Sequence, residues 1–286
     1  MGTRAFLGLA VFVTSLCTSA VTSAQELVRF ESAPVQIGQL QRRLAQERGE
    51  TPKAAADTIE GYLAKPEGDG PFAAIVHLHG CDGLSKDAPK FIAQFVTGLG
   101  YVSLAVDSFA TRGIKDACTK PMPALMLARQ GDALGALSYL SKLPFVDPQR
   151  IAVLGASMGG MVALQLASTH HMETFDAPRD LKFKAAVAYY PLCGVASEEL
   201  IVPALILIGE LDDWTPARDC ELWMKRRADR GAPVKLVVYP GAYHAFSVPA
   251  FADGREMFGH WLKYDAKAAR SAVQEMRSFL AAQFAR

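Results

Sequence analysis

The sequence lacks the features of several large classes of protein. It has almost no excess charge, with 30 Lys+Arg against 29 Asp+Glu in 286 residues, which argues against a nucleic-acid partner or an acidic-lipid surface. Only 21% of residues are charged and 50% are hydrophobic, which excludes a disordered chain and predicts one large core. After residue 24 no apolar run is long enough to span a bilayer. No glycine-rich nucleotide motif appears, so we expect no cofactor.

The N-terminal residues have the pattern of a secretory signal peptide. Arg4 supplies a positive charge, residues 5–16 are apolar but too few to span a bilayer, and residues 21–24 offer small side chains for cleavage. We therefore expect a signal peptide over 1–24 and a single domain over 25–286. The mature protein is expected to be periplasmic or secreted, with no membrane partner. An uncleaved membrane anchor is the alternative.

Export would place the cysteines in an oxidising compartment, where disulfides form. Apart from Cys17, the chain has four cysteines, enough for two disulfides. We predict a bond between Cys193 and Cys220, because one follows a predicted strand and the other begins the helix after the next strand, so that their loops should be neighbours. Free, buried thiols are the alternative.

Apolar segments rich in strand-forming residues alternate with helical patterns from about residue 58 onward. Such alternation is typical of an α/β protein with right-handed crossovers and a mostly parallel sheet flanked by helices. Ligands bind at the carboxyl ends of the strands in such sheets, so the residues that follow each strand are the ones to inspect. The predicted strands are Ile59–Leu63, Phe72–His79, Tyr101–Val106, Ile151–Leu154, Ala185–Tyr189, Ala204–Ile208 and Val234–Val238. The predicted helices are Lys90–Leu99, Met122–Leu143, Met161–Ala167, Ala217–Arg230 and Lys267–Phe284.

A G-x-S-x-G motif follows the strand Ile151–Leu154. In this setting Ser157 would sit on a tight turn between strand and helix that lifts its hydroxyl clear of the backbone. Gly155 and Gly159 remove the Cβ atoms that would collide there. We interpret Ser157 as a nucleophile. A glycine-rich packing turn with an incidental serine is the alternative.

A nucleophilic serine needs a base, and the base needs an acid to orient it. Asp212 and Asp213 follow one later strand and His244 follows the next, giving the chain order Ser, Asp, His. We expect His244 to be the base and Asp212 the acid, because Asp212 lies nearer the strand end. Thr215 is expected to be the N-cap of the following helix.

The oxyanion hole should follow an earlier strand. His79-Gly80-Cys81 comes at the end of such a strand, so the backbone N–H groups of Cys81 and Met158 are the expected oxyanion donors. We expect the Cys81 side chain to remain a free thiol.

Four segments carry a family resemblance: HLHGCDG, GASMGG, GELDDWTP and YPGAYHAF. In this order and spacing they resemble the dienelactone hydrolase family of the α/β-hydrolase fold, over about four-fifths of the chain. The resemblance implies that Ser157 matches the nucleophile, Asp212 the acid and His244 the base. The chain departs from the best-known members in two ways, since they have cysteine at the nucleophile and glutamate at the position of Gly80.

Other residues are candidates for binding. Arg112 is placed to bind a substrate carboxylate with two hydrogen bonds, although a surface arginine is the alternative. Trp214 and Tyr243 flank the expected acid and base and are candidates for the wall of an apolar acyl site, or for aromatic packing. The pair His77 and His79 resembles the start of a zinc site, but we expect no metal.

The sequence thus predicts an exported serine hydrolase of small carboxylic esters or lactones, with an acyl-enzyme intermediate. A peptidase or polyester hydrolase using the same residues is one alternative. A non-catalytic periplasmic binding protein that retains the fold is another.

Overall fold

The computed structural model of the chain describes residues 25–50, 55–119, 123–168, 173–178 and 180–285. The expected signal peptide over 1–24 lies outside the described residues. None of the helices within the described ranges is long and apolar enough to cross a membrane.

An eight-stranded sheet forms the centre of the molecule, with the strand order β1-β2-β4-β3-β5-β6-β7-β8. The strands from β4 to β8 in this order are parallel, and β2 is antiparallel to both of its neighbours. This confirms the predicted α/β class with a mostly parallel sheet. The strands are β1 (Glu26–Glu31), β2 (Thr58–Ala64), β3 (Phe72–Leu78), β4 (Val102–Asp107), β5 (Val146–Ala156), β6 (Ala186–Tyr189), β7 (Ala204–Gly209) and β8 (Val234–Tyr239).

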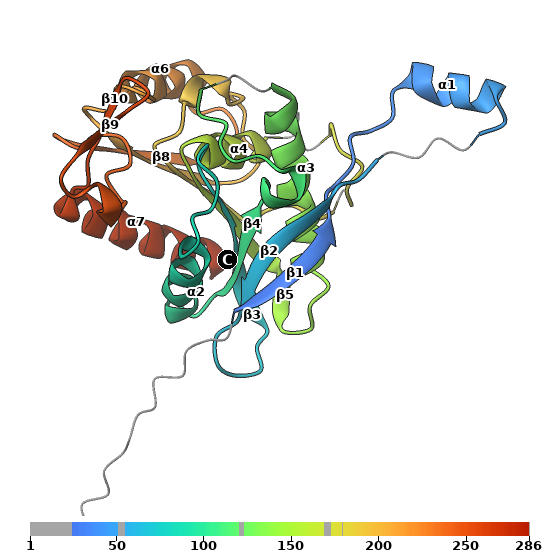
Figure 1. Cartoon of the computed structure of the whole chain (residues 1–286), viewed down its shortest axis with the longest axis horizontal. Coiled ribbons are helices and arrows are strands. Elements are labelled where there is room, and N and C mark those ends of the chain that lie inside the picture. Colours follow the sequence, from blue (N-terminus) through green and yellow to red (C-terminus); the bar gives the residue numbers. More distant parts are fainter. Residues whose placement is uncertain (1–24, 51–54, 120–122, 169–172, 179, 286) are drawn as a thin grey trace, which may run out of the picture.

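Helices cover both faces of this sheet. In Figure 1, α3, α4 and α6 lie on one side of it, and α2 and α7 lie on the other. The helices are α1 (Gln39–Glu47), α2 (Ala88–Gly98), α3 (Pro123–Leu140), α4 (Met158–Leu166), α6 (Ala217–Arg227) and α7 (Ala266–Phe284). Among the described residues, short 3₁₀ helices are η1 (Ala110–Arg112), η2 (Cys193–Val195) and η3 (Pro249–Phe251).

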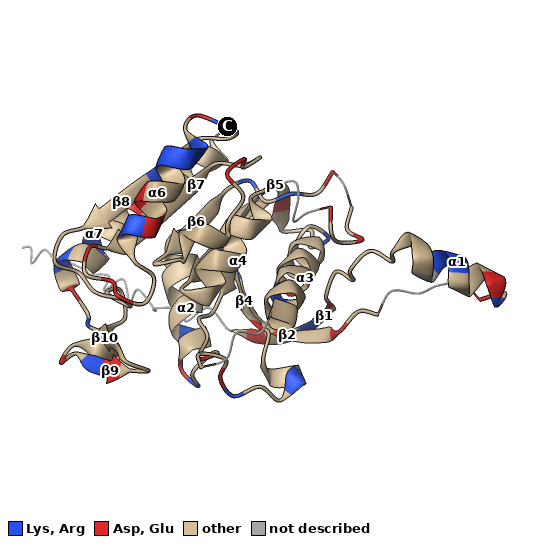
Figure 2. Ribbon diagram, turned by 90° about the horizontal axis from the view of Figure 1, so that it is seen from above, with Lys and Arg blue, Asp and Glu red and all other residues tan. Residues whose placement is uncertain are grey.

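The central strands β6 and β7 consist almost entirely of apolar residues, which suits them to the middle of the sheet. Every residue of β6 and β7 is buried, as expected of parallel strands covered on both faces. Figure 2 shows the same arrangement, with the charged residues on the outer elements and none on β6 or β7. The burial of these strands fixes their carboxyl ends, and so fixes the loops that carry the candidate site.

The sequence did not predict the first and the shortest elements. Only Val28 and Phe30 are buried among the six residues of β1, because it lies at the sheet edge and packs one face alone. Helix α1 is mostly polar and projects away from the sheet. A two-stranded hairpin of β9 (Arg255–Met257) and β10 (His260–Leu262) was also missed, since three-residue strands have no readable periodicity.

Candidate functional site

The expected nucleophile occupies a strained turn between β5 and α4. Ser157 has φ 52° and ψ −119°, a conformation that costs an L-residue energy and that persists only where surrounding packing imposes it. A Cβ on Gly155 would lie 2.1 Å from the carbonyl oxygen of Gly159, and one on Gly159 would lie 2.2 Å from that of Leu78. Both positions therefore require glycine, and the start of α4 packs directly on the end of β3.

Ser157, His244 and Asp212 come together at the carboxyl ends of β5, β8 and β7. His244 Nε2 lies 3.2 Å from Ser157 Oγ, and His244 Nδ1 lies 2.7 Å from Asp212 Oδ2. Asp212 is 4% exposed and His244 2%, so water competes little for these bonds. An ionised carboxylate can only accept, so Nδ1–H donates to Asp212. Nε2 is then left to accept the Ser157 hydroxyl proton.

The two adjacent carboxylates have different surroundings. Asp212 Oδ1 accepts hydrogen bonds from the backbone N–H of Trp214 at 3.0 Å and of Thr215 at 2.8 Å. Asp213 points outward, with its side chain 53% exposed and Oδ1 3.5 Å from Nδ1 of His260. The structure thus places Asp212, and not Asp213, against His244.

Thr215 is not the helix cap that the sequence predicts. Pro216 holds the cap position of α6, and the Thr215 hydroxyl is buried under the acid and base. Its Oγ1 lies 3.0 Å from Asp212 Oδ2, 3.2 Å from His244 Nδ1 and 3.0 Å from the carbonyl oxygen of Tyr190. The sequence around Thr215 did not indicate these contacts, because one of them is made to Tyr190, which follows a different strand.

Three consecutive carbonyl groups of the segment after β3 are held by donors. The guanidinium of Arg129 donates to the carbonyl oxygen of His79. The Nδ1 of His79 is 2.7 Å from the carbonyl oxygen of Gly80, and the Ala117 N–H donates to that of Cys81 at 2.7 Å. Because the N–H of a trans peptide points opposite to its C=O, the held Gly80 carbonyl sets the direction of the Cys81 N–H.

Both expected oxyanion donors lie beside the nucleophile. Met158 is the first residue of α4, so its N–H has no helical carbonyl four residues earlier to bond. The Cys81 N–H makes no hydrogen bond within the described part of the chain. A Cβ placed on Gly80 would lie 3.9 Å from Ser157 Cβ, which brings the Gly80–Cys81 peptide to the nucleophile.

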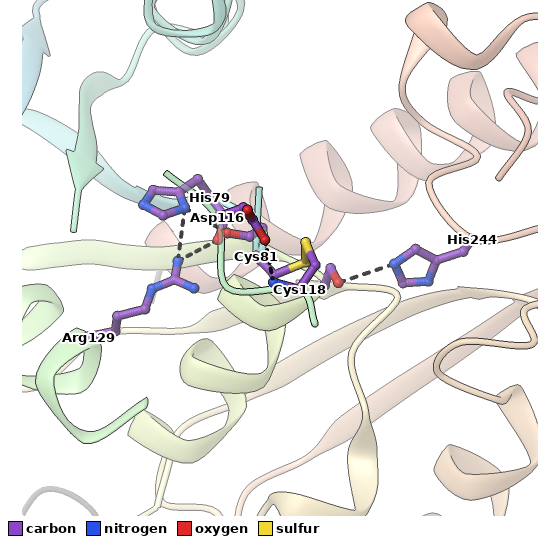
Figure 3. Close-up of a disulfide and its surroundings, with 8 residues drawn as sticks. His79, Cys81, Asp116, Cys118, Arg129 and His244 are labelled. Carbon is purple, nitrogen blue, oxygen red and sulfur yellow. Dashed lines mark hydrogen bonds between the residues drawn. A yellow bond between two sulfur atoms is a disulfide. The ribbon is translucent and has the colours of Figure 1, made fainter. Parts of the chain in front are cut away.

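The expectation that Cys81 is a free thiol is wrong. Cys81 forms a disulfide with Cys118, with 4.9 Å between the Cα atoms (Figure 3). A backbone N–H committed to an oxyanion hole leaves the side chain of the same residue free to bond elsewhere. Cys193 and Cys220, for which a bond was predicted, are joined in the structure with the same Cα separation of 4.9 Å.

Arg112 is held within the protein, which corrects its interpretation as a substrate-binding residue. Its guanidinium donates to both carboxylate oxygens of Asp132, at 2.7 and 2.9 Å, and to Asp57 Oδ2 at 2.7 Å. Asp132 is fully buried, and its hydrogen bond is the main reason why the pKa of Arg112 is raised above its usual range. With these bonds made, Arg112 has no pair of donors left for a substrate carboxylate.

A second arginine, which the sequence analysis missed, lies beneath the site. Arg129 is fully buried on α3, and burial lowers the pKa of its side chain to about 10. Its guanidinium lies 5.5 Å from the ring of Phe109, and its Nε and Nη1 have no partner among the described residues. The only sign in the sequence that Arg129 has a special role is its position as a cation on a largely apolar helix.

Trp214 lies beside His244 and contacts further aromatic side chains. The Trp214 ring is 5.2 Å from the His244 ring and stacks on His260 at 4.9 Å, with 14° between the planes. Phe258, at the tip of the β9–β10 hairpin, lies 5.9 Å from Trp214 and is 51% exposed. Tyr243 is half-buried in the position before His244.

The histidine pair at the end of β3 is largely buried within the protein. Nδ1 of His77 is buried without a partner among the described residues. His79 is 3% exposed, and its Nε2 accepts the backbone N–H of Ser108 at 3.3 Å. Burial lowers the pKa of His77 to about 4 and that of His79 well below its usual range. Within the described ranges, no group of three His, Cys, Asp or Glu residues is placed to hold a metal ion.

Known proteins resemble this chain over most of its length. The model of the dienelactone hydrolase family matches residues 59–284. A probable 2-oxo-3-(5-oxofuran-2-ylidene)propanoate lactonase of Bradyrhizobium is 25% identical over 203 residues, which are 65% of this chain and 77% of that protein. Esterase FrsA of Klebsiella pneumoniae is 30% identical over 108 residues, which are 38% of this chain and 25% of that protein. The chain thus spans about a quarter of the FrsA relatives it matches.

Solved structures share the fold. A dienelactone hydrolase-like promiscuous phosphotriesterase from metagenomic libraries superimposes with a TM-score of 0.64 at 19% identity, covering 91% of this chain and 99% of that one. Thermogutta terrifontis esterase 2, phosphonylated by cyclosarin, gives a TM-score of 0.59 at 20% identity, covering 80% and 91%. The central sheet and its helices are therefore those of this group of proteins.

Proposed function

The chain belongs to the dienelactone hydrolase family, and we propose that it is a serine hydrolase that cleaves small carboxylic esters or lactones through an acyl-enzyme. One observation carries the proposal: an unbroken line of hydrogen-bonding distances from Ser157 through His244 to Asp212. This arrangement, buried and aimed from three strand ends, is a set of nucleophile, base and orienting acid. A binding protein would gain nothing from holding Ser157 in a strained turn.

The geometry supports acyl transfer in two halves. The Ser157 hydroxyl gives its proton to His244 Nε2 as its oxygen attacks the carbonyl carbon, and Asp212 stabilises the imidazolium that forms. Protonated His244 then gives the proton to the leaving alcohol, which departs and leaves the acyl-enzyme. Water repeats the sequence and frees the acid. The N–H groups of Cys81 and Met158 stabilise the oxyanion, and each such donor is typically worth about 3 kcal/mol of barrier.

Uncharged esters fit this site better than anionic ones. Arg112 is fully paired and Arg129 is buried, so neither presents a guanidinium to a substrate carboxylate. A Cβ on Gly80 would lie 2.8 Å from Asp82 Oδ1, which puts this exposed carboxylate beside Ser157. The negative charge of Asp82 next to the nucleophile would repel an anionic substrate.

Trp214 and Tyr243 are proposed to line the leaving-group side of the site. His244 Nε2 returns its proton to the leaving group, so the surface beside His244 is where that group lies. The Trp214 ring, in contact with His244 and with Phe258 of the hairpin, offers an apolar, flat face there.

We also propose that residues 1–24 are a signal peptide and that the protein acts in the periplasm or outside the cell. The two disulfides support this, because such bonds persist in oxidising compartments and are rare in the cytosol.

A panel of uncharged and anionic esters, a lactone, a peptide and a polyester tests the proposed function. We expect hydrolysis of small esters by the wild-type protein, and a loss of at least ~10³-fold in kcat with Ser157→Ala at unchanged fold. Cleavage of the peptide or the polyester in preference to small esters would favour the alternative activities. Equal activity in Ser157→Ala would refute the mechanism.

A further inference from the structure

The two disulfides differ in their relation to the site. Cys193 and Cys220 are both fully buried and join η2 to α6. Cys81 is 8% exposed and Cys118 is partly exposed. This second bond joins the segment that supplies an oxyanion donor to a stretch, residues 114–118, with no helix or strand of its own (Figure 3).

We propose that Cys118 is a positioning residue for ester hydrolysis, and that the Cys81–Cys118 disulfide holds the Cys81 N–H in the direction that the oxyanion requires. The inference rests on the proposed function. It goes beyond that function because it makes activity depend on the oxidation of one particular bond, which belongs to none of the three side chains that carry the chemistry.

The contacts around Cys81 show how the disulfide would act. The Cys81 carbonyl accepts the Ala117 N–H at 2.7 Å, so residues 81 and 117–118 are tied by one hydrogen bond and one covalent bond. The Cys118 N–H in turn lies 3.4 Å from Asp116 Oδ1, which closes the turn that presents Cys118. Ile114 and the buried Ala117 of this stretch pack in a small apolar cluster with Phe109 and Leu125. Breaking the sulfur–sulfur bond removes the strongest of these ties and leaves the Gly80–Cys81 peptide held only by the hydrogen bonds to the carbonyl groups of Gly80 and Cys81.

The reduction that would break the bond is ordinary thiol–disulfide exchange. A dithiol attacks one sulfur, the sulfur–sulfur bond breaks, and a second attack releases the cyclic oxidised dithiol. Two electrons and two protons pass from the dithiol to the cysteines, which end as two thiols. Attack requires access, so the partly exposed Cys81–Cys118 bond should be reduced before the buried Cys193–Cys220 bond.

The test compares two double variants that each remove one disulfide. Cys81→Ala with Cys118→Ala should lower kcat for a small ester by about 10- to 100-fold, a part of the ~10²–10³-fold that complete loss of one oxyanion donor costs. KM should change less than about threefold, since the donor acts mainly in the transition state. Cys193→Ala with Cys220→Ala, the matched control, should lower the melting temperature and change kcat less than about threefold.

A thiono ester separates positioning from general loss of structure. Its sulfur accepts hydrogen bonds poorly, so the wild-type rate ratio of oxo to thiono ester contains the contribution of the oxyanion donors. The ratio should fall in the variant without the Cys81–Cys118 bond and stay unchanged in the control. Dithiothreitol on the wild type, with reduced cysteines mapped by alkylation in a parallel sample, should reproduce the effect, and reoxidation should reverse it.

Three outcomes would overturn the inference. The first is an unchanged kcat in the variant or in reduced wild type whose Cys81 and Cys118 are mapped as thiols. The second is an equal loss of kcat in both double variants, and the third is an unchanged oxo-to-thiono ratio. Wild-type protein that hydrolyses none of the esters would instead refute the proposed function, which distinguishes the two failures.

Discussion

The two sides of the candidate site are built in different ways. On the triad side, Ser157, Asp212 and His244 stand at the ends of buried strands and are joined by hydrogen bonds. On the oxyanion side, residues 79–81 are held by the buried Arg129, by the ring of His79 within the segment itself, and by the disulfide to Cys118. The sheet alone positions the triad side, whereas the oxyanion side depends on segments distant in sequence. Substitutions on the two sides should therefore differ in what they change: kcat, KM or the free energy of unfolding.

The largest effect is expected from the acid of the triad side. Asp212→Asn removes the charge that stabilises the imidazolium and disturbs the tautomer of His244, and should lower kcat by up to ~10⁴-fold. Asp213→Asn is the matched control. Because Asp213 is 53% exposed and faces His260, its replacement should cost less than about tenfold, roughly 1 kcal/mol. Steady-state kinetics of both variants check this. The reverse order of effects would make Asp213 the acid.

The triad side could be predicted from the sequence, whereas the contacts that hold the oxyanion side could not. The G-x-S-x-G turn and the residues after β7 and β8 are local patterns, because the strained turn at Ser157 and the strand ends are set by neighbouring residues. The partners of the oxyanion side carry no such pattern. Cys118 is 37 residues from Cys81, and Arg129 comes from α3, so only the three-dimensional fold brings them together.

Acid should lower the stability of the protein through the two largely buried histidines at the end of β3. In the folded protein burial lowers the pKa of His77 to about 4 and that of His79 well below its usual range. The unfolded chain binds these protons from about pH 6.5 downward, so the free energy of unfolding should fall below that pH, by roughly 2 kcal/mol at pH 5 for His77 alone. Urea unfolding at pH 7 and pH 5 measures this loss.

A neutral replacement isolates the contribution of one histidine. His77→Gln cannot take up a proton, so the difference between its unfolding free energies at pH 7 and pH 5 should be smaller than in the wild type by about that amount. The same pH dependence in both proteins would show that His77 does not contribute.

The leaving-group wall on the triad side should show a smaller, substrate-dependent effect. Trp214→Ala should raise KM for a phenyl ester about tenfold, since burying a substrate ring against an indole is worth about 1 kcal/mol or more. KM for a methyl ester of the same acid should change less than about threefold. Trp261→Ala, in the β9–β10 hairpin, is the control, because the Trp261 ring packs on Gly254 and makes no ring contact with His244 among the described residues. Equal effects on the two esters would contradict the assignment of Trp214.

The smallest effect concerns the charge beside the nucleophile. Asp82→Asn should raise kcat/KM for a monoester of a dicarboxylic acid about fivefold, because about 1 kcal/mol of repulsion between two nearby charges is removed. An uncharged ester should change less than about twofold. Asp69→Asn, an exposed position before β3 at the opposite end of that strand, should leave both rates unchanged. An unchanged preference in Asp82→Asn would show that its carboxylate does not face the substrate.

Labelling with a fluorophosphonate tests the central claim most directly, because the reagent reacts only with a serine that is activated and exposed to substrate. The adduct is located by mass spectrometry of the digested protein, with Ser157→Ala and Asp212→Asn treated in parallel. We predict one adduct, on Ser157, that forms fast in the wild type, slowly in Asp212→Asn and not at all in Ser157→Ala. An adduct on another serine, or none on the folded wild-type protein, would contradict the account.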